Sequence, residues 1–182
     1  MLYRKDYENI KKWYESSEKK ALLIDGARQI GKTYLIREFL KNETESYVEF
    51  NLIENNLAKE AFETSDTASE LLLKISALAN KPLMKNKTVI FIDEVQFAKE
   101  VLTKVKFLIE EGSYKYIFSG SILGVEIKNV NSLPVGYMDI IEMNPMDFEE
   151  FAIANGVSKN TFTYLKERFD RCEQVDSIIH NQ

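Results

Sequence analysis

Residues 21–33 read ALLIDGARQIGKT, and this stretch decides the fold class. Its first four residues are apolar, as in a strand that is buried on both faces. The residues from Gly26 to Thr33 satisfy the pattern G-x-x-x-x-G-K-[ST], and apolar residues at helical spacing follow between Lys32 and Leu40. A strand, a glycine-rich turn and a helix in this order form the context that a phosphate-binding loop requires.

The loop contains the residues needed to hold a polyphosphate. Gly26 and Gly31 allow the backbone to turn so that successive N–H groups point at phosphate oxygens. The following helix directs the positive end of its dipole at the same anion. We expect Lys32 to contact the β- and γ-phosphates and the Thr33 hydroxyl to bind Mg²⁺. The predicted nucleotide-binding residues are Gly26, Ala27, Arg28, Gln29, Ile30, Gly31, Lys32, Thr33 and Tyr34.

A second apolar run ends in two carboxylates. Residues 89–92 read VIFI, and Asp93 and Glu94 follow directly. A carboxylate at the end of a buried strand is costly unless it is paired or binds a metal. In a nucleotide site, Asp93 would hold Mg²⁺ together with Thr33. Glu94 would then be the general base that takes a proton from the attacking water.

Two serines follow the next predicted strand. Residues 114–118 read YKYIF, and Ser119 and Ser121 come after them. In P-loop ATPases a small polar residue at this point contacts the γ-phosphate or the attacking water. The sequence does not choose between the two serines, and a strand followed by a plain glycine turn is the alternative. Gln96 likewise stays open between a residue that orients Glu94 or the water and an ordinary polar loop residue.

Strands alternate with helices along the whole chain. We predict strands at residues 21–24, 47–51, 89–92, 114–118 and 137–143, and helices at 5–17, 32–40, 55–80 (two helices), 99–111, 145–156 and from 158 toward 179. This alternation predicts an α/β fold whose central parallel sheet of five strands is covered by helices on both faces. Residues 123–134 show no clear period and are predicted to form a loop. We expect residues 1–143 to form the nucleotide-binding core and residues 144–182 to form C-terminal helices.

Composition and charge exclude several classes of protein. Residues 1–138 carry 20 basic and 20 acidic side chains, whereas residues 139–182 carry 4 and 9, so the net charge of −5 comes from the C-terminal part. A neutral body with an acidic end does not favour nucleic-acid binding. The single cysteine, Cys172, excludes an intrachain disulfide framework, and we predict that it is buried on the last helix. Because no apolar run approaches the ~18 residues of a membrane span and no signal peptide is recognisable, we predict a cytoplasmic protein without membrane contact.

Five motifs follow one another in the order of a known family. They are GARQIGKT (26–33), FIDEVQ (91–96), FSGS (118–121), SLPVG (132–136) and NPMDFEEF (144–151). Together they resemble the prokaryotic AAA-type ATPases that carry a C-terminal DUF4143 domain, and the resemblance covers nearly the whole chain. It implies an AAA-type P-loop core that binds ATP and hydrolyses it to ADP and phosphate with Mg²⁺. Tyr137 stands where relatives often have Arg or Lys.

The resemblance also raises the question of length. Members of that family continue into a winged-helix-like segment and the DUF4143 domain, so this chain resembles an ATPase core cut from a longer protein or a naturally shortened copy. We therefore expect slow hydrolysis from it. A nucleotide-dependent switch with little hydrolysis and a P-loop kinase stay open as alternatives. The candidate partners are ATP and ADP, a second copy of the chain and the C-terminal domain.

Overall fold

The computed structural model describes residues 2–98, 100–121, 136–176 and 179 of the 182-residue chain. The loop predicted at 123–134 lies outside these residues. The chain divides into two compact units, one of Asp6–Asn144 and one of Met1–Lys5 together with Pro145–Gln182. No helix in the described ranges combines the length and the apolar composition that a membrane span requires.

The larger unit contains a parallel sheet of five strands, as the sequence predicts. The strands are β1 (Ala21–Asp25), β2 (Ser46–Asn51), β3 (Thr88–Asp93), β4 (Lys115–Gly120) and β5 (Met138–Glu142). Their order is β2-β3-β4-β1-β5, and every neighbouring pair is parallel. All five carboxyl ends therefore lie at one edge of the sheet, which is where open α/β sheets bind their ligands.

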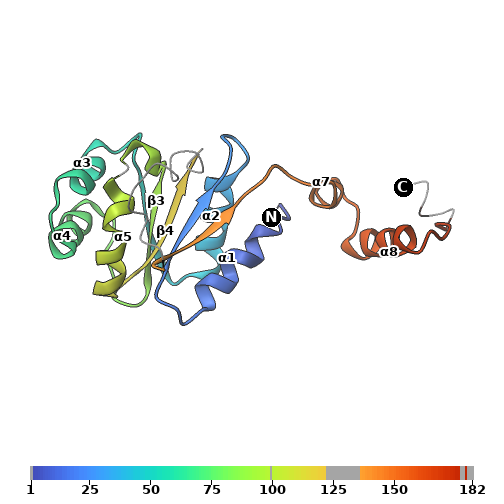
Figure 1. Cartoon of the computed structure of the whole chain (residues 1–182), viewed down its shortest axis with the longest axis horizontal. Helices are drawn as coiled ribbons and strands as arrows, with labels where there is room; N and C mark the ends of the chain where they lie inside the picture. Colours follow the sequence, from blue (N-terminus) through green and yellow to red (C-terminus); the bar gives the residue numbers. More distant parts are fainter. Residues whose placement is uncertain (1, 99, 122–135, 177–178, 180–182) are drawn as a thin grey trace. The chain divides into compact units, whose positions relative to one another are not determined.

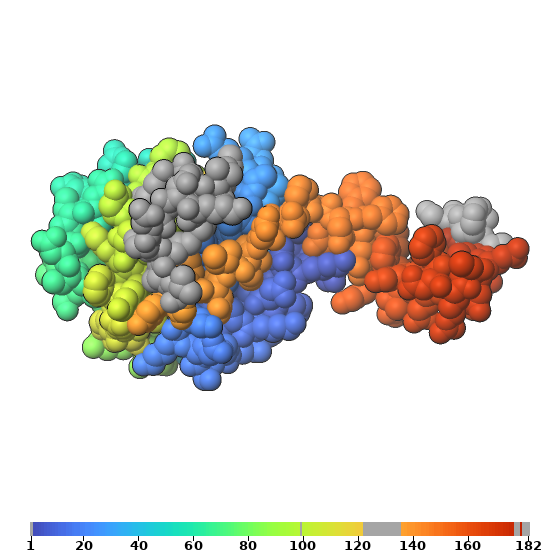
Figure 2. Space-filling view, viewed as in Figure 1, coloured from blue at the N-terminus to red at the C-terminus, as the bar shows by residue number. Residues whose placement is uncertain are grey.

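Helices cover both faces of this sheet (Figure 1). Alternate residues of a strand point to opposite faces. Leu22 and Ile24 of β1 thus pack against α1 (Asp6–Glu15) and α2 (Lys32–Glu43). Leu23 packs into the second core. That core is formed with α3 (Asn56–Thr64), α4 (Ala68–Leu78) and α5 (Glu100–Glu111), whose adjacent surfaces are visible in turquoise and yellow-green in Figure 2.

The smaller unit contains α7 (Phe148–Ala154) and α8 (Lys159–Asp170). Ser158 is the N-cap of α8, as predicted, and its hydroxyl accepts a hydrogen bond from the backbone N–H of Thr161. The helix ends at Asp170, well before the predicted position near 179. Cys172 follows the helix in an exposed turn, so the prediction of a buried helical cysteine was wrong. The physical reason is that α8, described over its whole length, has no buried residue and provides no core for a cysteine to fill.

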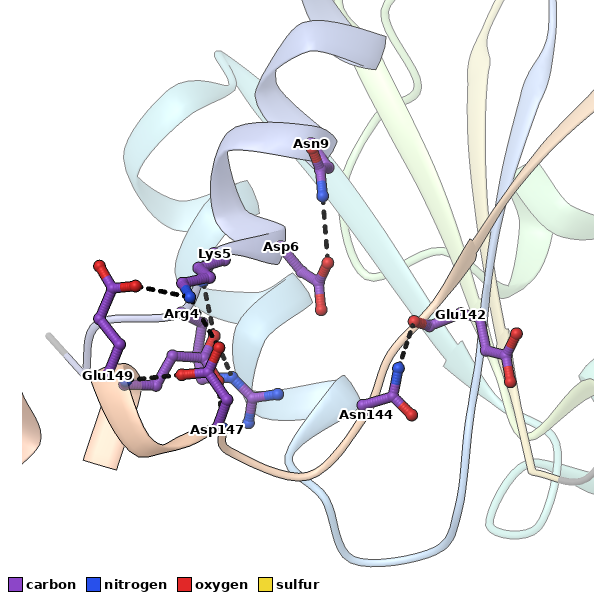
Figure 3. Close-up of polar contacts among 9 residues, drawn as sticks. Arg4, Lys5, Asp6, Asn9, Glu142, Asn144, Asp147 and Glu149 are labelled. Carbon is purple, nitrogen blue, oxygen red and sulfur yellow. Dashed lines mark hydrogen bonds and ion pairs between the residues drawn. The ribbon is translucent and has the colours of Figure 1, made fainter. Parts of the chain in front are cut away.

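The first residues of the chain contact the acidic first turn of α7 (Figure 3). Lys5 Nζ lies 2.7 Å from Asp147 Oδ2 and 2.7 Å from Glu149 Oε2, and these hydrogen bonds raise the pKa of Lys5. Arg4 Nε lies 3.3 Å from Glu150 Oε1, and both of these side chains are buried. Sequence periodicity did not predict this contact, because ion pairs between distant segments leave no local pattern.

Candidate functional site

The loop between β1 and α2 requires glycine at two positions for different reasons. Gly26 has φ 153° and Gly31 has φ 94°. A Cβ atom at residue 26 would lie 2.3 Å from the carbonyl oxygen of Met143, which follows β5, so the neighbouring backbone excludes a side chain there. A Cβ atom at residue 31 would meet nothing within 4 Å, and it is the positive φ that favours glycine there.

Lys32 begins α2 and directs its ammonium group into the loop. Its Nζ donates hydrogen bonds to the carbonyl oxygens of Gly26 (2.8 Å) and Ala27 (2.7 Å). It also lies 3.4 Å from Ser121 Oγ, which follows β4. Burial lowers the pKa of Lys32, although the carboxylate of Glu94 opposes this effect. The fold thus holds one desolvated positive charge at the centre of the loop.

Asp93 ends β3 and is almost completely buried, with 2% of its surface exposed. Thr33 Oγ1 donates to Asp93 Oδ2 over 2.9 Å, and Ser119 Oγ donates to Oδ1. The backbone N–H of Glu94 also donates to Oδ1, over 3.0 Å. The three contacts fix the carboxylate beside the first turn of α2.

The oxygens of Thr33 and Asp93 fit a magnesium ion in their chemistry. A hydroxyl and a carboxylate are hard oxygen donors, which Mg²⁺ prefers, and Mg²⁺ in nucleotide sites takes further ligands from phosphates and water. No group of three or more His, Cys, Asp or Glu side chains among the described residues could hold a metal. Thr33 and Asp93 thus offer two oxygen ligands to a cation whose other ligands come from phosphates and water.

Glu94 follows Asp93 in a left-handed backbone conformation, with φ 62° and ψ 44°. It is the N-cap of a short 3-10 helix, η1 (Val95–Phe97). Gln96, within that helix, donates through Nε2 to Glu94 Oε2 and accepts through Oε1 from the backbone N–H of Ser121 over 3.2 Å. Gln96 therefore contacts Glu94 directly, and the two roles that the sequence leaves open for it stay predictions.

An open pocket of about 490 Å³ lies above these groups. Its lining includes the predicted residues Arg28, Gln29, Gly31, Lys32, Thr33, Tyr34, Glu94 and Ser121. Asp93 and Ser119 are buried beneath it, and Gly26 and Ala27 contribute the carbonyls that hold Lys32. Ile30 packs instead against the core under α1 and α2. The fold therefore brings the predicted residues to one edge of the sheet, with the two serines at different depths.

Sequence reasoning missed two residues of the pocket. Ile53 and Phe97 line it, and their side chains are 53% and 43% exposed. Exposed apolar surface beside a polar loop suits the flat face of a nucleotide base. Ile53 lies in a turn after β2 and Phe97 ends the short helix η1, and a single apolar residue in so short a segment has no periodic signal that would single it out.

Three solved structures share this fold. The ORC1 protein of Aeropyrum pernix in complex with DNA matches with a TM-score of 0.54 and 13% identity, over 80% of this chain and 47% of that one. Hsp104 with ATPγS and FITC-casein in its closed state matches with a TM-score of 0.53 and 15% identity, over 87% of this chain and 30% of that one. Drosophila ORC bound to AT-rich DNA and Cdc6 matches with a TM-score of 0.50 and 10% identity, over 97% of this chain and 73% of that one. Identities this low show the fold alone, and the chain spans about half the length of the ORC1 chain.

The sequence also matches a family model described as an AAA domain, over residues 18–152. This range includes the glycine loop, the Asp93–Glu94 pair and both serines. No curated protein sequence matches the chain.

Proposed function

Because the chain belongs to the AAA-domain family of P-loop ATPases, we propose that it binds ATP with Mg²⁺ and hydrolyses it to ADP and phosphate. The observation that supports this best is the meeting of four side chains from two segments that lie about 60 residues apart in the sequence. Lys32 and Thr33 begin α2, Asp93 ends β3 and Glu94 follows it, and Thr33 is hydrogen-bonded to Asp93 over 2.9 Å.

Each residue has a defined part in the proposed reaction. Lys32 contacts the β- and γ-phosphates, and Thr33 and Asp93 hold Mg²⁺, which when bound neutralises charge on the phosphate oxygens. Glu94 takes a proton from water as the water oxygen bonds to the γ-phosphorus. The bond from that phosphorus to the bridging oxygen breaks, and ADP keeps the bridging oxygen. Within the AAA-domain family, we place the chain with the prokaryotic members that carry a DUF4143 domain, on the five motifs it contains in order.

Removal of the Lys32 ammonium tests nucleotide binding. Lys32→Ala loses a charge-assisted contact worth roughly 1.5–3 kcal/mol, so ATP affinity should weaken about tenfold or more. Calorimetry at fixed Mg²⁺ measures this, with Lys41→Ala, an exposed lysine of the same helix, as the matched control. Unchanged affinity in a folded Lys32→Ala protein would contradict the phosphate-loop assignment.

Substitution of Glu94 separates binding from chemistry. Glu94→Gln keeps the size of the side chain and cannot take a proton, so ATP should still bind while hydrolysis falls by about 10²-fold or more. Asp93→Asn should instead weaken the dependence of binding on Mg²⁺. Wild-type hydrolysis by Glu94→Gln would require a different general base.

A nucleotide-dependent switch with little hydrolysis is the second candidate. One observation favours it: Arg28 and Lys32 are the only cationic residues among the described residues that line the pocket. Steady-state phosphate release decides between the two candidates. A chain that binds ATP tightly and releases phosphate no faster than Glu94→Gln does would be a switch.

A further inference from the structure

The side chain of Gln96 joins Glu94 to the end of β4. Its Nε2 donates to Glu94 Oε2, and its Oε1 accepts from the backbone N–H of Ser121 over 3.2 Å. We propose that Gln96 is a positioning residue that sets the direction of the Glu94 carboxylate within the nucleotide pocket. This inference rests on the proposed function, because it concerns the group that would take the proton from water.

The two partners of Gln96 require one orientation of its amide group. A carboxylate accepts hydrogen bonds, so it needs the NH₂ end of the amide, whereas a backbone N–H needs the oxygen end. Rotating the amide by half a turn would place its oxygen against the carboxylate of Glu94 and its NH₂ against the N–H of Ser121. The network therefore fixes the amide without a competing arrangement, and the amide in turn fixes one oxygen of Glu94.

The backbone of Glu94 is constrained at the same time. Its φ of 62° is uncommon for a residue with a Cβ atom, and such conformations persist where the surroundings determine them. Its N–H donates to Asp93 Oδ1 over 3.0 Å, and its carbonyl oxygen accepts from Phe97 N over 3.1 Å. The backbone is thus held from both sides, and Gln96 supplies the remaining constraint, on the side chain.

The same network reaches the glycine loop. Lys32 Nζ lies 3.4 Å from the hydroxyl of Ser121, whose backbone N–H donates to Gln96. Polar contacts therefore run from Lys32 through Ser121 and Gln96 to Glu94, across segments that follow β1, β4 and β3. Since Gln96 contacts the base and is not one of the residues that line the pocket, its loss should affect the chemical step more than the binding of nucleotide.

Two substitutions at residue 96 test the proposal. Gln96→Met keeps the length of the side chain and removes both hydrogen bonds. Gln96→Glu keeps an acceptor for Ser121 N–H and places a second carboxylate against Glu94. Each should lower kcat about tenfold or more, while KM and the calorimetric Kd for ATPγS change by less than about twofold. Melting curves establish that each variant folds, and Gln96→Glu serves if Gln96→Met does not.

A double-mutant comparison separates positioning from general damage. In the Glu94→Gln background the carboxylate that Gln96 positions is gone, so adding Gln96→Met should cause no further loss of kcat. Asn9→Ala is the matched control. It removes another amide–carboxylate hydrogen bond, from Asn9 Nδ2 to Asp6 Oδ1 over 3.1 Å on α1, and should leave kcat unchanged (Figure 3).

The outcomes distinguish this inference from the proposed function. If the wild-type chain does not hydrolyse ATP, or if Glu94→Gln hydrolyses ATP at the wild-type rate, the proposed function fails and this inference fails with it. If Glu94→Gln is impaired but Gln96→Met keeps the wild-type kcat, only the assignment of Gln96 is overturned. The assignment of Gln96 is also overturned if the kcat losses of Glu94→Gln and Gln96→Met multiply when the two substitutions are combined. It is overturned as well if the Gln96 variants bind ATPγS more weakly and keep the wild-type kcat.

Discussion

At residue 26 the backbone after β5 leaves no room for a side chain, whereas at residue 31 only the backbone conformation is demanding. A Cβ atom at residue 26 would lie 2.3 Å from Met143 O, which is a backbone atom and cannot rotate away. Gly31→Ala has space and introduces only the strain of a positive φ, about 1–2 kcal/mol. We predict that Gly26→Ala lowers the melting temperature and the ATP affinity more than Gly31→Ala does. If the two variants lost equal melting temperature in thermal melts and equal ATP affinity in calorimetry, the close approach of residue 26 to the backbone of Met143 would be unimportant.

The sequence reveals single residues of the site when their chemistry follows a fixed spacing. Lys32 and Thr33 could be predicted because the glycine loop places them at the start of a helix, and Asp93 because it ends an apolar strand. A contact of Gln96 with Glu94 was one of the alternatives that the sequence left open, but the contact of Gln96 with Ser121 could not be predicted, because it depends on how the segments after β3 and β4 meet. Spacing along the chain determines local geometry, and a contact between separate strands depends on their order in the sheet.

The N-terminus of α7 is stabilised by a capping box. Asp147 accepts from the backbone N–H of Glu150 over 2.9 Å, and Glu150 Oε2 accepts from the backbone N–H of Asp147 over 3.1 Å. Asp147→Ala removes this cap and should cost about 1 kcal/mol, whereas Asp147→Asn keeps an acceptor and should cost less. Hydrogen exchange of the α7 amides measures the difference. Equal exchange in the two variants would show that the charge of Asp147, and not its cap, stabilises the helix.

We expect the same carboxylate to make α7 sensitive to acid. The hydrogen bond from Glu150 N–H and the contact with Lys5 hold the pKa of Asp147 below its usual range. A depressed pKa in the folded state adds stability above the unfolded value of about 3.9, and this stability is lost as the pH falls through the folded value. We predict that α7 amides of the wild-type chain lose protection below about pH 4 relative to those of Asp147→Asn. Parallel losses in both proteins would assign the effect to other carboxylates.

The periodicity of the sequence predicted where strands and helices lie better than it predicted which strands pair with one another. The apolar runs around Leu23 and Phe91 became central strands because a sheet covered on both faces needs continuous apolar sequence. The order β2-β3-β4-β1-β5 could not be predicted from those runs, since nothing local in a strand says which neighbour it pairs with. The predicted end of the last helix near residue 179 was also wrong: α8 ends at Asp170, and none of its residues is buried in a core.

On the scale of the whole molecule, long-range ion pairs joined segments that the sequence keeps apart. Residues 1–5 belong to the same compact unit as residues 145–182, and Arg4 and Lys5 contact the first turn of α7. Sequence analysis placed the N-terminal residues with the nucleotide-binding core. Sequence patterns report on residues that are close together in the chain, whereas Arg4 and Lys5 pair with carboxylates that lie more than 140 residues away in the sequence.

We predict that the positive charge at the pocket limits the rate at which a single copy hydrolyses ATP. Within the described part of the chain, the pocket lining contains two cationic side chains, Arg28 and Lys32. An additional arginine at the phosphates supplies about 10³–10⁵ in rate in related phosphoryl transfers. If a second copy supplies that arginine, phosphate release per chain should lie well below ~1 s⁻¹ in dilute solution and rise with protein concentration. Phosphate release measured over a concentration series, with light scattering alongside, tests this.

Arg28→Ala is the comparison: if Arg28 already supplies the charge within one copy, its loss lowers the rate equally at every concentration. Fast turnover in dilute solution that does not change with concentration would show that one copy is sufficient.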